Sequence, residues 1–277
     1  MGKIEEALRR AKAASKPAGR PSLPTASIAS DLQAERASVR PPSGLLSIAK
    51  PVELDPDILT RHRVIADAQQ TNSASSYKML RTRMLQRLRS SDWSRIAVTS
   101  ARRNAGKTLT AVNTAISLAR EPNQQVMLVD LDLRRPALGE YLGIHHPFGI
   151  SDFLRGKATV EQILVRPNID RLLVVPNNDS FDNSSEMLSS QRMVEFVRLI
   201  SEPVNASIVL FDLPPLLEAD DFLAFSSQID ALLLVVCEGE TRRADLQQAL
   251  DLTRDMNLLG LVLNKSREDD HPTGYYY

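Results

Sequence analysis

Short, nearly continuous apolar segments recur along the chain, and stretches with helical periodicity separate them. The apolar segments are residues 95–100, 126–132, 171–177, 207–212, 231–237 and 258–264. Strands that are apolar along their whole length are typical of a parallel sheet covered on both faces. A helix expected over residues 76–88 precedes the first segment. The alternation of strands and helices predicts the α/β fold class, with a doubly wound, mostly parallel sheet.

The beginning of the chain lacks this pattern. Residues 1–16 place apolar side chains at helical spacing among basic ones, which predicts a short amphipathic helix, either docked on a partner or on anionic lipid, or solvated. Seven of the 16 prolines fall within residues 17–58, a composition that predicts a disordered linker. We therefore expect one folded domain over residues 59–266 and a flexible polar tail over residues 267–277.

Composition narrows the classes of function. Lys plus Arg and Asp plus Glu both number 34, so the net charge is zero and does not favour nucleic acid as a partner. The single cysteine, Cys237, forms no intrachain disulfide, which suits a reducing cytoplasm. The sequence has neither a signal peptide nor an apolar run of about 18 residues, so we expect a cytoplasmic chain that reaches a membrane through a partner.

The strongest chemical signal follows the segment 95–100. Residues 101–108 read ARRNAGKT and lead into the apolar helical segment 109–119. A phosphate loop needs backbone N–H groups at a helix N-terminus, a lysine for the β and γ phosphates, and a hydroxyl for Mg²⁺. We therefore predict that ATP and Mg²⁺ bind here. The predicted nucleotide contacts are Arg103, Asn104, Ala105, Gly106, Lys107, Thr108 and Leu109.

Acidic residues follow two further strands, at the edge of the sheet where open α/β folds bind ligands. Asp130 and Asp132 end one apolar segment, and Asp212 ends another. A single aspartate after a strand is most often a helix cap or a turn residue. Three of them on strands neighbouring a phosphate loop predict a site for a Mg²⁺–nucleotide complex.

A family resemblance begins with the segment VMLVDLDLRRPALGEYLG. It resembles the second phosphate-loop motif of the bacterial tyrosine kinases that control polysaccharide synthesis and export. The resemblance continues in GISDFLRGKATVEQIL, SSEMLSSQRM, VLFDLPPLLEADD and GLVLNK, and covers roughly residues 62–277. The helix YKMLRTRMLQRL and the opening MGKIEEALRRAK resemble the exosortase-associated autokinases more narrowly. The family implies a P-loop NTPase of the deviant Walker type, as in Min and Par proteins.

The resemblance implies an ATP-dependent protein-tyrosine autokinase that regulates exopolysaccharide synthesis and export. In the family a tyrosine-rich C-terminus is the phosphate acceptor, and three of the five tyrosines here are Tyr275, Tyr276 and Tyr277. The implied partners are other copies of the chain, a tyrosine phosphatase, and a membrane-embedded chain-length or co-polymerase protein at the inner face of the plasma membrane. Phosphorylated tails would repel one another and loosen the assembly.

The same resemblance assigns roles within the site. Lys107 and the N–H groups of the loop would stabilise the β and γ phosphate oxygens, and Asp130 would accept the tyrosine proton. Asn264, at the end of the last strand, is a candidate contact to the adenine base, with a turn residue as the alternative. Mg²⁺ would be held, mostly through water, by Thr108, Asp132 and Asp212.

Three departures from the family pattern bear on activity and assembly. The loop reads RNAGKT where relatives read close to PGEGKS or PGEGKT, so Asn104 replaces a glycine and Ala105 an acidic residue. Relatives carry a Glu and two Arg that mediate ring assembly where this chain has Ser75, Lys78 and Arg81. The tail also holds fewer tyrosines than in many relatives, which narrows the range of graded phosphorylation.

These departures leave two alternatives to an active kinase. The altered loop suits a catalytically weak or inactive scaffold of the same system, which binds ATP without turnover. A Min- or Par-type positioning ATPase shares the fold and the acidic motifs. Such proteins carry a signature lysine near the start of the loop, where this chain has Arg102, and they lack a tyrosine tail. The tail therefore favours the kinase.

Overall fold

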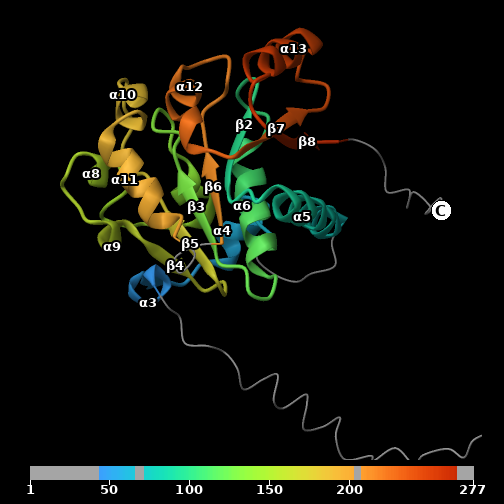
Figure 1. Cartoon of the computed structure of the whole chain (residues 1–277). Coiled ribbons are helices and arrows are strands. Elements are labelled where there is room, and N and C mark those ends of the chain that lie inside the picture. The colour runs from blue at the N-terminus through green and yellow to red at the C-terminus, as the bar shows by residue number, and fades with distance from the viewer. Residues whose placement is uncertain (1–43, 66–71, 203–206, 267–277) are drawn as a thin grey trace, which may run out of the picture. The chain divides into compact units, whose positions relative to one another are not determined.

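The computed structural model of the chain describes residues 44–65, 72–202 and 207–266, which form one α/β unit (Figure 1). The amphipathic helix, most of the linker and the tyrosine-bearing tail that the sequence predicts lie outside these residues. The strands of the unit are β1 (Lys50–Val52), β2 (Arg95–Ser100), β3 (Val126–Asp130), β4 (Val165–Pro167), β5 (Leu172–Val175), β6 (Ile208–Asp212), β7 (Ala231–Cys237) and β8 (Leu258–Asn264).

All of these strands belong to one sheet, in the order β1-β4-β5-β3-β6-β2-β7-β8. From β5 to β8 the neighbours are parallel, whereas β4 runs antiparallel to β5. The parallel strands are the six apolar segments found in the sequence, which confirms the predicted doubly wound, mostly parallel sheet. In this order β2 lies between β6 and β7, so the chain that leaves β2 emerges in the interior of the sheet, beside the end of β6.

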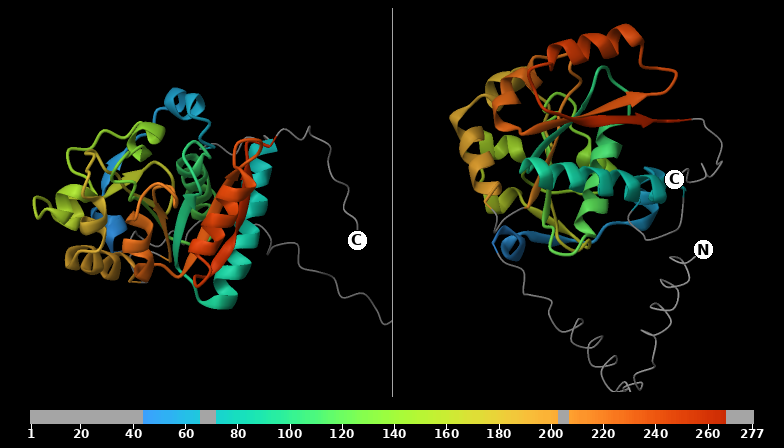
Figure 2. Two further views of the ribbon diagram at one scale, coloured as in Figure 1. Left: turned by 90° about the horizontal axis from the view of Figure 1, so that it is seen from above. Right: turned by 45° about the vertical axis from the view of Figure 1, so that its right-hand side comes forward.

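Helices cover both faces of the sheet (Figure 2). One face packs against α4 (Pro56–Arg61), α5 (Asn72–Ser91), α6 (Lys107–Ala119) and α7 (Leu138–Leu142). The other packs against α3 (Leu45–Ile48), α8 (Ile150–Leu154), α9 (Val160–Ile163), α10 (Ser184–Leu188), α11 (Gln191–Ile200), α12 (Asp221–Phe225) and α13 (Arg243–Leu252); the 3-10 helix η1 (Ser226–Gln228) follows α12. None of the helices in the described ranges is both long and apolar enough to span a bilayer.

The two apolar cores explain why the strands lack alternation in their sequence. Along β3, Val126 and Leu128 belong to the core under α5 and α6, whereas Met127 and Val129 belong to the core on the opposite face. All four side chains are fully buried. A strand with two buried faces needs apolar residues at every position, which is the pattern that identified these strands.

The linker that the sequence predicts up to residue 58 ends earlier, and the prediction is wrong for residues 44–58. This segment forms α3, β1 and the start of α4. β1 pairs in parallel with β4 at the edge of the sheet, and Leu45 and Leu46 are buried in one of the cores. Proline is tolerated in an edge strand because it loses no necessary ladder hydrogen bond. Pro51 in β1 therefore made a folded segment resemble a linker.

Asp230 joins the beginnings of β2 and β7. Its carboxylate accepts hydrogen bonds from the backbone N–H groups of Ser94 and Arg95, at 2.9 and 2.8 Å. It also pairs with the Arg95 guanidinium at 2.5 Å. Partial burial raises the pKa of Asp230, but these hydrogen bonds and the arginine charge outweigh burial and lower the pKa overall. The ionised carboxylate thus holds the beginnings of two neighbouring interior strands together.

We predict that Asp230→Ala lowers the free energy of unfolding at pH 7 by about 1–3 kcal/mol, because two partly buried N–H groups lose their acceptor. The lowered pKa means that the native state favours the ionised carboxylate. Its contribution is therefore present above the unfolded pKa of about 4 and is lost as the pH falls through the native pKa.

Urea denaturation of the wild-type protein and of Asp230→Ala, at pH 7 and below pH 4, checks this prediction. The difference between their free energies of unfolding should be smaller in acid. Asp255→Ala is the matched control, because Asp255 is 91% exposed and pairs only with its neighbour Arg254. Equal stability of the Asp230 and Asp255 variants at pH 7 would contradict the assigned role.

Candidate nucleotide site

The phosphate loop connects β2 to α6 at the centre of the sheet. Two of its residues have left-handed backbone, Asn104 with φ +64° and Gly106 with φ +84°. Asparagine adopts this region more readily than most residues, so the loop tolerates Asn104 in place of a glycine. The 13-residue helix α6 begins at Lys107, and the free N–H groups of its first turn form an anion-binding end.

Four of the predicted residues come together where the loop meets β3 and β6. The Lys107 ammonium Nζ lies 2.8 Å from Asp132 Oδ2 and 3.3 Å from Asp212 Oδ1. The Thr108 hydroxyl donates to Asp212 Oδ2 at 2.6 Å. The sheet order explains the cluster, because β3 and β6 are neighbours and β6 adjoins β2. The carboxyl ends of three adjacent strands therefore supply a lysine, a hydroxyl and two carboxylates.

Burial and charge oppose each other at Lys107. Burial lowers the pKa of its ammonium, but the carboxylates of Asp212 and Asp132 outweigh burial and raise the pKa overall. For Asp212, burial raises the pKa and exceeds the lowering effect of Lys107 and Thr108. The lysine is therefore cationic at neutral pH, and its ammonium is shared between the carboxylates of Asp132 and Asp212. Phosphate oxygens that enter the site would find the cation already in place.

Asp130 is placed differently from the other acids. It is fully buried, and its carboxylate accepts hydrogen bonds from the backbone N–H groups of Asp132, Ala137 and Leu138, at 3.2, 3.1 and 3.0 Å. Burial and the charge of Asp212 raise the pKa of Asp130 to about 8. In this position the side chain holds the turn between β3 and α7, and with it Asp132.

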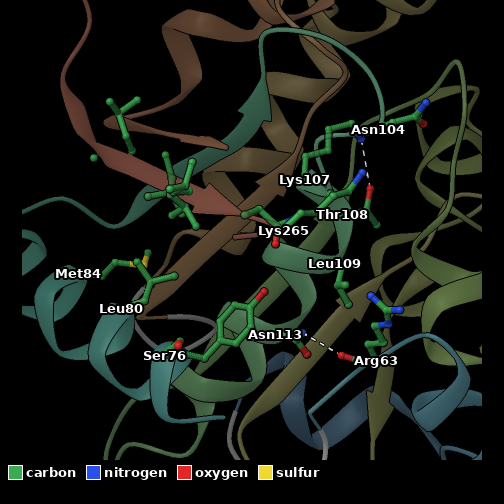
Figure 3. A pocket seen from close by; sticks show the side chains of 18 of the residues that line it. Arg63, Ser76, Leu80, Met84, Asn104, Lys107, Thr108, Leu109, Asn113 and Lys265 are labelled. Atoms are coloured by element: carbon green, nitrogen blue, oxygen red, sulfur yellow. Dashed lines mark hydrogen bonds between the residues drawn. The ribbon is translucent and has the colours of Figure 1, made fainter. Parts of the chain in front are cut away.

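A cleft of about 1870 Å³ opens over this cluster, between the phosphate loop, α5 and β8. Figure 3 looks into it, with Lys107 and Thr108 at the loop and Leu80 and Met84 of α5 on another wall. Ala105, Asp130 and Asp212 lie buried beneath its surface. The predicted site residues that line the cleft are Arg103, Asn104, Gly106, Lys107, Thr108, Leu109, Asp132 and Asn264.

Asn264 supports the loop from the end of β8. Its side-chain N–H donates to the carbonyl of Ala105 at 2.8 Å. A Cβ atom on Gly106 would lie 2.1 Å from the same Asn264 nitrogen, so a side chain at position 106 would displace it. Glycine is thus required here for close packing as well as for its positive φ. The predicted contact of Asn264 with adenine stays a prediction.

Sequence reasoning missed two acidic residues that hold the site together. Glu218 binds Arg103 of the phosphate loop. Asp221, which is fully buried, accepts from Arg134 Nε at 3.1 Å and from the Ser184 hydroxyl at 2.6 Å. Arg134 lines the cleft. Neither acid belongs to a recognisable spacing, because Glu218 lies in the irregular segment after β6, Asp221 begins the short helix α12, and both reach partners more than 35 residues away in the chain.

The donors present fit a nucleotide that arrives with Mg²⁺. Thr108, Asp132 and Asp212 offer a hydroxyl and two carboxylates beside the anion-binding end of α6. Within the described ranges, no three His, Cys, Asp or Glu side chains are grouped so that they could hold a metal ion. Mg²⁺ is commonly bound by one or two carboxylates together with phosphate oxygens and water, which is the combination that this site and ATP would provide.

Comparison with known proteins places the chain among kinases. No family model matches it. The chain is 30% identical over 185 residues to the tyrosine-protein kinase YwqD of Bacillus subtilis, an alignment that covers 66% of this chain and 76% of YwqD. It is 30% identical over 173 residues to the tyrosine-protein kinase CpsD of Streptococcus pneumoniae, covering 61% of this chain and 75% of CpsD.

Solved structures show the same fold. The kinase domain of the Escherichia coli tyrosine kinase ETK aligns with a TM-score of 0.67 and 23% identity, over 76% of this chain and 84% of that domain. The cell division ATPase MinD of Pyrococcus furiosus aligns with a TM-score of 0.54 and 22% identity, over 63% and 73%. These likenesses confirm the predicted P-loop NTPase fold. Because 30% identity extends over three quarters of YwqD, the chain belongs to the family of bacterial tyrosine-protein kinases.

Proposed function

We propose that this chain is an ATP-dependent protein-tyrosine autokinase that phosphorylates Tyr275, Tyr276 and Tyr277. One observation carries the proposal: in a chain of the tyrosine-kinase family, Lys107, Thr108 and two carboxylates meet at the anion-binding end of α6. This combination of groups serves phosphoryl transfer, in which positioning and charge neutralisation provide most of the catalysis. The terminal tyrosines are the proposed acceptors because the family resemblance assigns that role to a tyrosine-rich C-terminus, and three of the five tyrosines of this chain are Tyr275, Tyr276 and Tyr277.

In the proposed reaction the phosphates of ATP lie on the phosphate loop, and the tyrosine oxygen attacks the γ-phosphorus as ADP leaves. Mg²⁺ would neutralise phosphate charge, held by Thr108, Asp132 and Asp212. Lys107 turns from the carboxylates to the β and γ phosphate oxygens, which keep its charge paired. The first N–H groups of α6 and those of the loop donate to the same oxygens.

Two aspartates are candidates to accept the tyrosine proton. Asp130 is the one that the family resemblance assigns, and its pKa of about 8 gives it affinity for a proton near neutral pH. Its full burial and its three backbone hydrogen bonds instead favour a role in holding the turn. Asp132 lines the cleft, although only 6% of it is exposed, whereas Asp130 does not line it. Asp132 is therefore the second candidate. We propose Asp130 and test it against Asp132.

The wider role in the proposal comes from the family resemblance. The kinase would regulate exopolysaccharide synthesis and export from the cytoplasmic side of the membrane, together with a membrane co-polymerase protein and a tyrosine phosphatase. It would assemble with other copies of itself. In the structure, Arg81, one of the positions that relatives use for ring assembly, pairs with Glu121 of its own chain at 2.9 Å. A ring, if formed, would therefore use other contacts as well.

We predict that incubation with γ-labelled ATP and Mg²⁺ labels the terminal tyrosines. Lys107→Met should reduce the label at least about 100-fold, because the transition state loses a buried cation. Deletion of Tyr275–Tyr277 should abolish the label but leave nucleotide binding intact. Mass-spectrometric site mapping provides the measurement, and Lys157→Met, on the exposed surface, is the matched control for loss of a lysine.

Tight nucleotide binding without any label, even beside a candidate membrane activator, would reject the autokinase. That result would favour the alternative of an ATP-binding scaffold, for which the replacement of a glycine and an acidic residue by Asn104 and Ala105 is the supporting observation.

A pH profile separates the two candidates for the proton acceptor. If Asp130 accepts the proton, it must be ionised, so kcat of the wild-type protein rises with pH and levels off above about 8. Asp130→Asn should then remove the rise of kcat with pH, whereas Asp132→Asn should lower kcat but leave the rise in place. A profile of Asp130→Asn with the same shape as that of the wild type would exclude Asp130 as the acceptor and leave it a structural role.

A further inference from the structure

Glu218 holds the phosphate loop through a two-point contact with Arg103. One carboxylate oxygen accepts the backbone N–H of Arg103 at 3.0 Å, and the other pairs with Nε of the same residue. The Glu218 side chain is only 18% exposed, compared with 46% for Arg103. The carboxylate therefore fixes both the backbone and the side chain of one loop residue from a largely buried position.

The segment that carries Glu218 is itself bound along β2 and the start of the loop. The backbone N–H of Leu216 donates to the carbonyl of Ser100 at 2.8 Å, and that of Leu217 donates to Ala101 at 3.2 Å. The buried Thr99 hydroxyl donates to the carbonyl of Pro214 at 2.6 Å. Next along the segment, the Glu218 side chain accepts from the backbone N–H of Arg103. The segment begins directly after Asp212, so it connects the acidic end of β6 to the phosphate loop.

The charge of Glu218 makes this contact informative. Glu218 lines the same cleft as Lys107 and Thr108, where the phosphates of ATP would lie. A carboxylate near bound phosphates repels them, and the paired Arg103 guanidinium offsets that repulsion. Charge alone therefore does not explain why a carboxylate stands here. The contacts indicate a structural role: Glu218 holds Arg103, in the part of the loop before Gly106 where the family resemblance expects a glycine and an acidic residue.

We propose that Glu218 is a positioning residue for the kinase reaction, which holds the first half of the phosphate loop in the conformation that receives the nucleotide. It acts through Arg103 and does not touch the reacting atoms. The inference rests on the proposed nucleotide site. It assigns to the segment after β6 a second task besides carrying Asp212, namely the alignment of the loop with the acids of the site.

The test is the equilibrium affinity of the purified full chain for a fluorescent ADP analogue, with and without Mg²⁺. Glu218→Ala removes both contacts and should weaken binding about five- to tenfold, the effect of losing one or two hydrogen bonds. Arg103→Ala removes the guanidinium, itself a predicted nucleotide contact, but keeps the backbone N–H that Glu218 accepts. If Glu218 acts through Arg103, Glu218→Ala should weaken binding less in the Arg103→Ala background than in the wild type, and an equal effect in both backgrounds would contradict action through the ion pair.

Asp245→Ala is the matched control for charge. Asp245 pairs with the neighbouring Arg102 at 2.9 Å but makes no contact with the loop backbone that compares with that of Glu218. The substitution Asp245→Ala removes the same charge beside the same loop, and the affinity of this variant for the analogue should stay within about twofold of the wild type. If repulsion were the only effect of Glu218, both alanine variants would bind the analogue more tightly than the wild type.

Unchanged or tighter binding by Glu218→Ala, at an unchanged unfolding temperature, would overturn the inference. If Glu218→Ala does not fold, Glu218→Gln provides the test, since it keeps an acceptor for the backbone N–H and loses the ion pair. A loss of affinity of about threefold supports the inference, and none overturns it. A wild-type chain that binds no analogue would reject the proposed nucleotide site itself, an outcome distinct from failure of the Glu218 assignment.

Discussion

The site depends on a cation held in a buried position between two carboxylates. The ammonium of Lys107 contacts Asp132 and Asp212, and each of the three residues comes from a different strand end. Removing such a charge from water is costly, and only close opposite charges offset the cost. The ion cluster therefore requires β2, β3 and β6 to be adjacent and in register. The two apolar cores provide this, because they hold the parallel strands from both faces.

The central sheet and the phosphate loop could be predicted because both leave strong local signals. Six apolar strands stand out in the sequence, and the lysine and threonine of the loop follow one of them directly. β1 could not be found in the same way, since it has three residues, contains Pro51 and is stabilised by its pairing with β4. Glu218 could not be predicted either. Its partner lies 115 positions away, and its own segment has no periodicity.

The structure explains one of the two departures of the loop from the expected family sequence, the one at Asn104. Asn104 occupies left-handed backbone at the position where the family resemblance leads us to expect a glycine, and asparagine adapts to that conformation. Ala105 is buried, and its carbonyl accepts the side chain of Asn264. The loop is thus held on two sides, by Glu218 from the segment after β6 and by Asn264 from β8. Although its sequence is unusual, the backbone of this phosphate loop is held in place by hydrogen bonds to two side chains from other segments.

The contact between Gly106 and Asn264 also constrains how this sequence can diverge. A methyl group on residue 106 would overlap the amide of Asn264, and a shorter residue at 264 would leave the carbonyl of Ala105 without that donor. The two positions are 158 residues apart in the chain, yet one contact restricts both of them: the Asn264 amide and the positive φ leave room only for glycine at 106, and the carbonyl of Ala105 needs the donor at 264. Among related sequences that share this contact both positions should therefore stay the same, a pattern that an alignment would reveal although no local motif joins them.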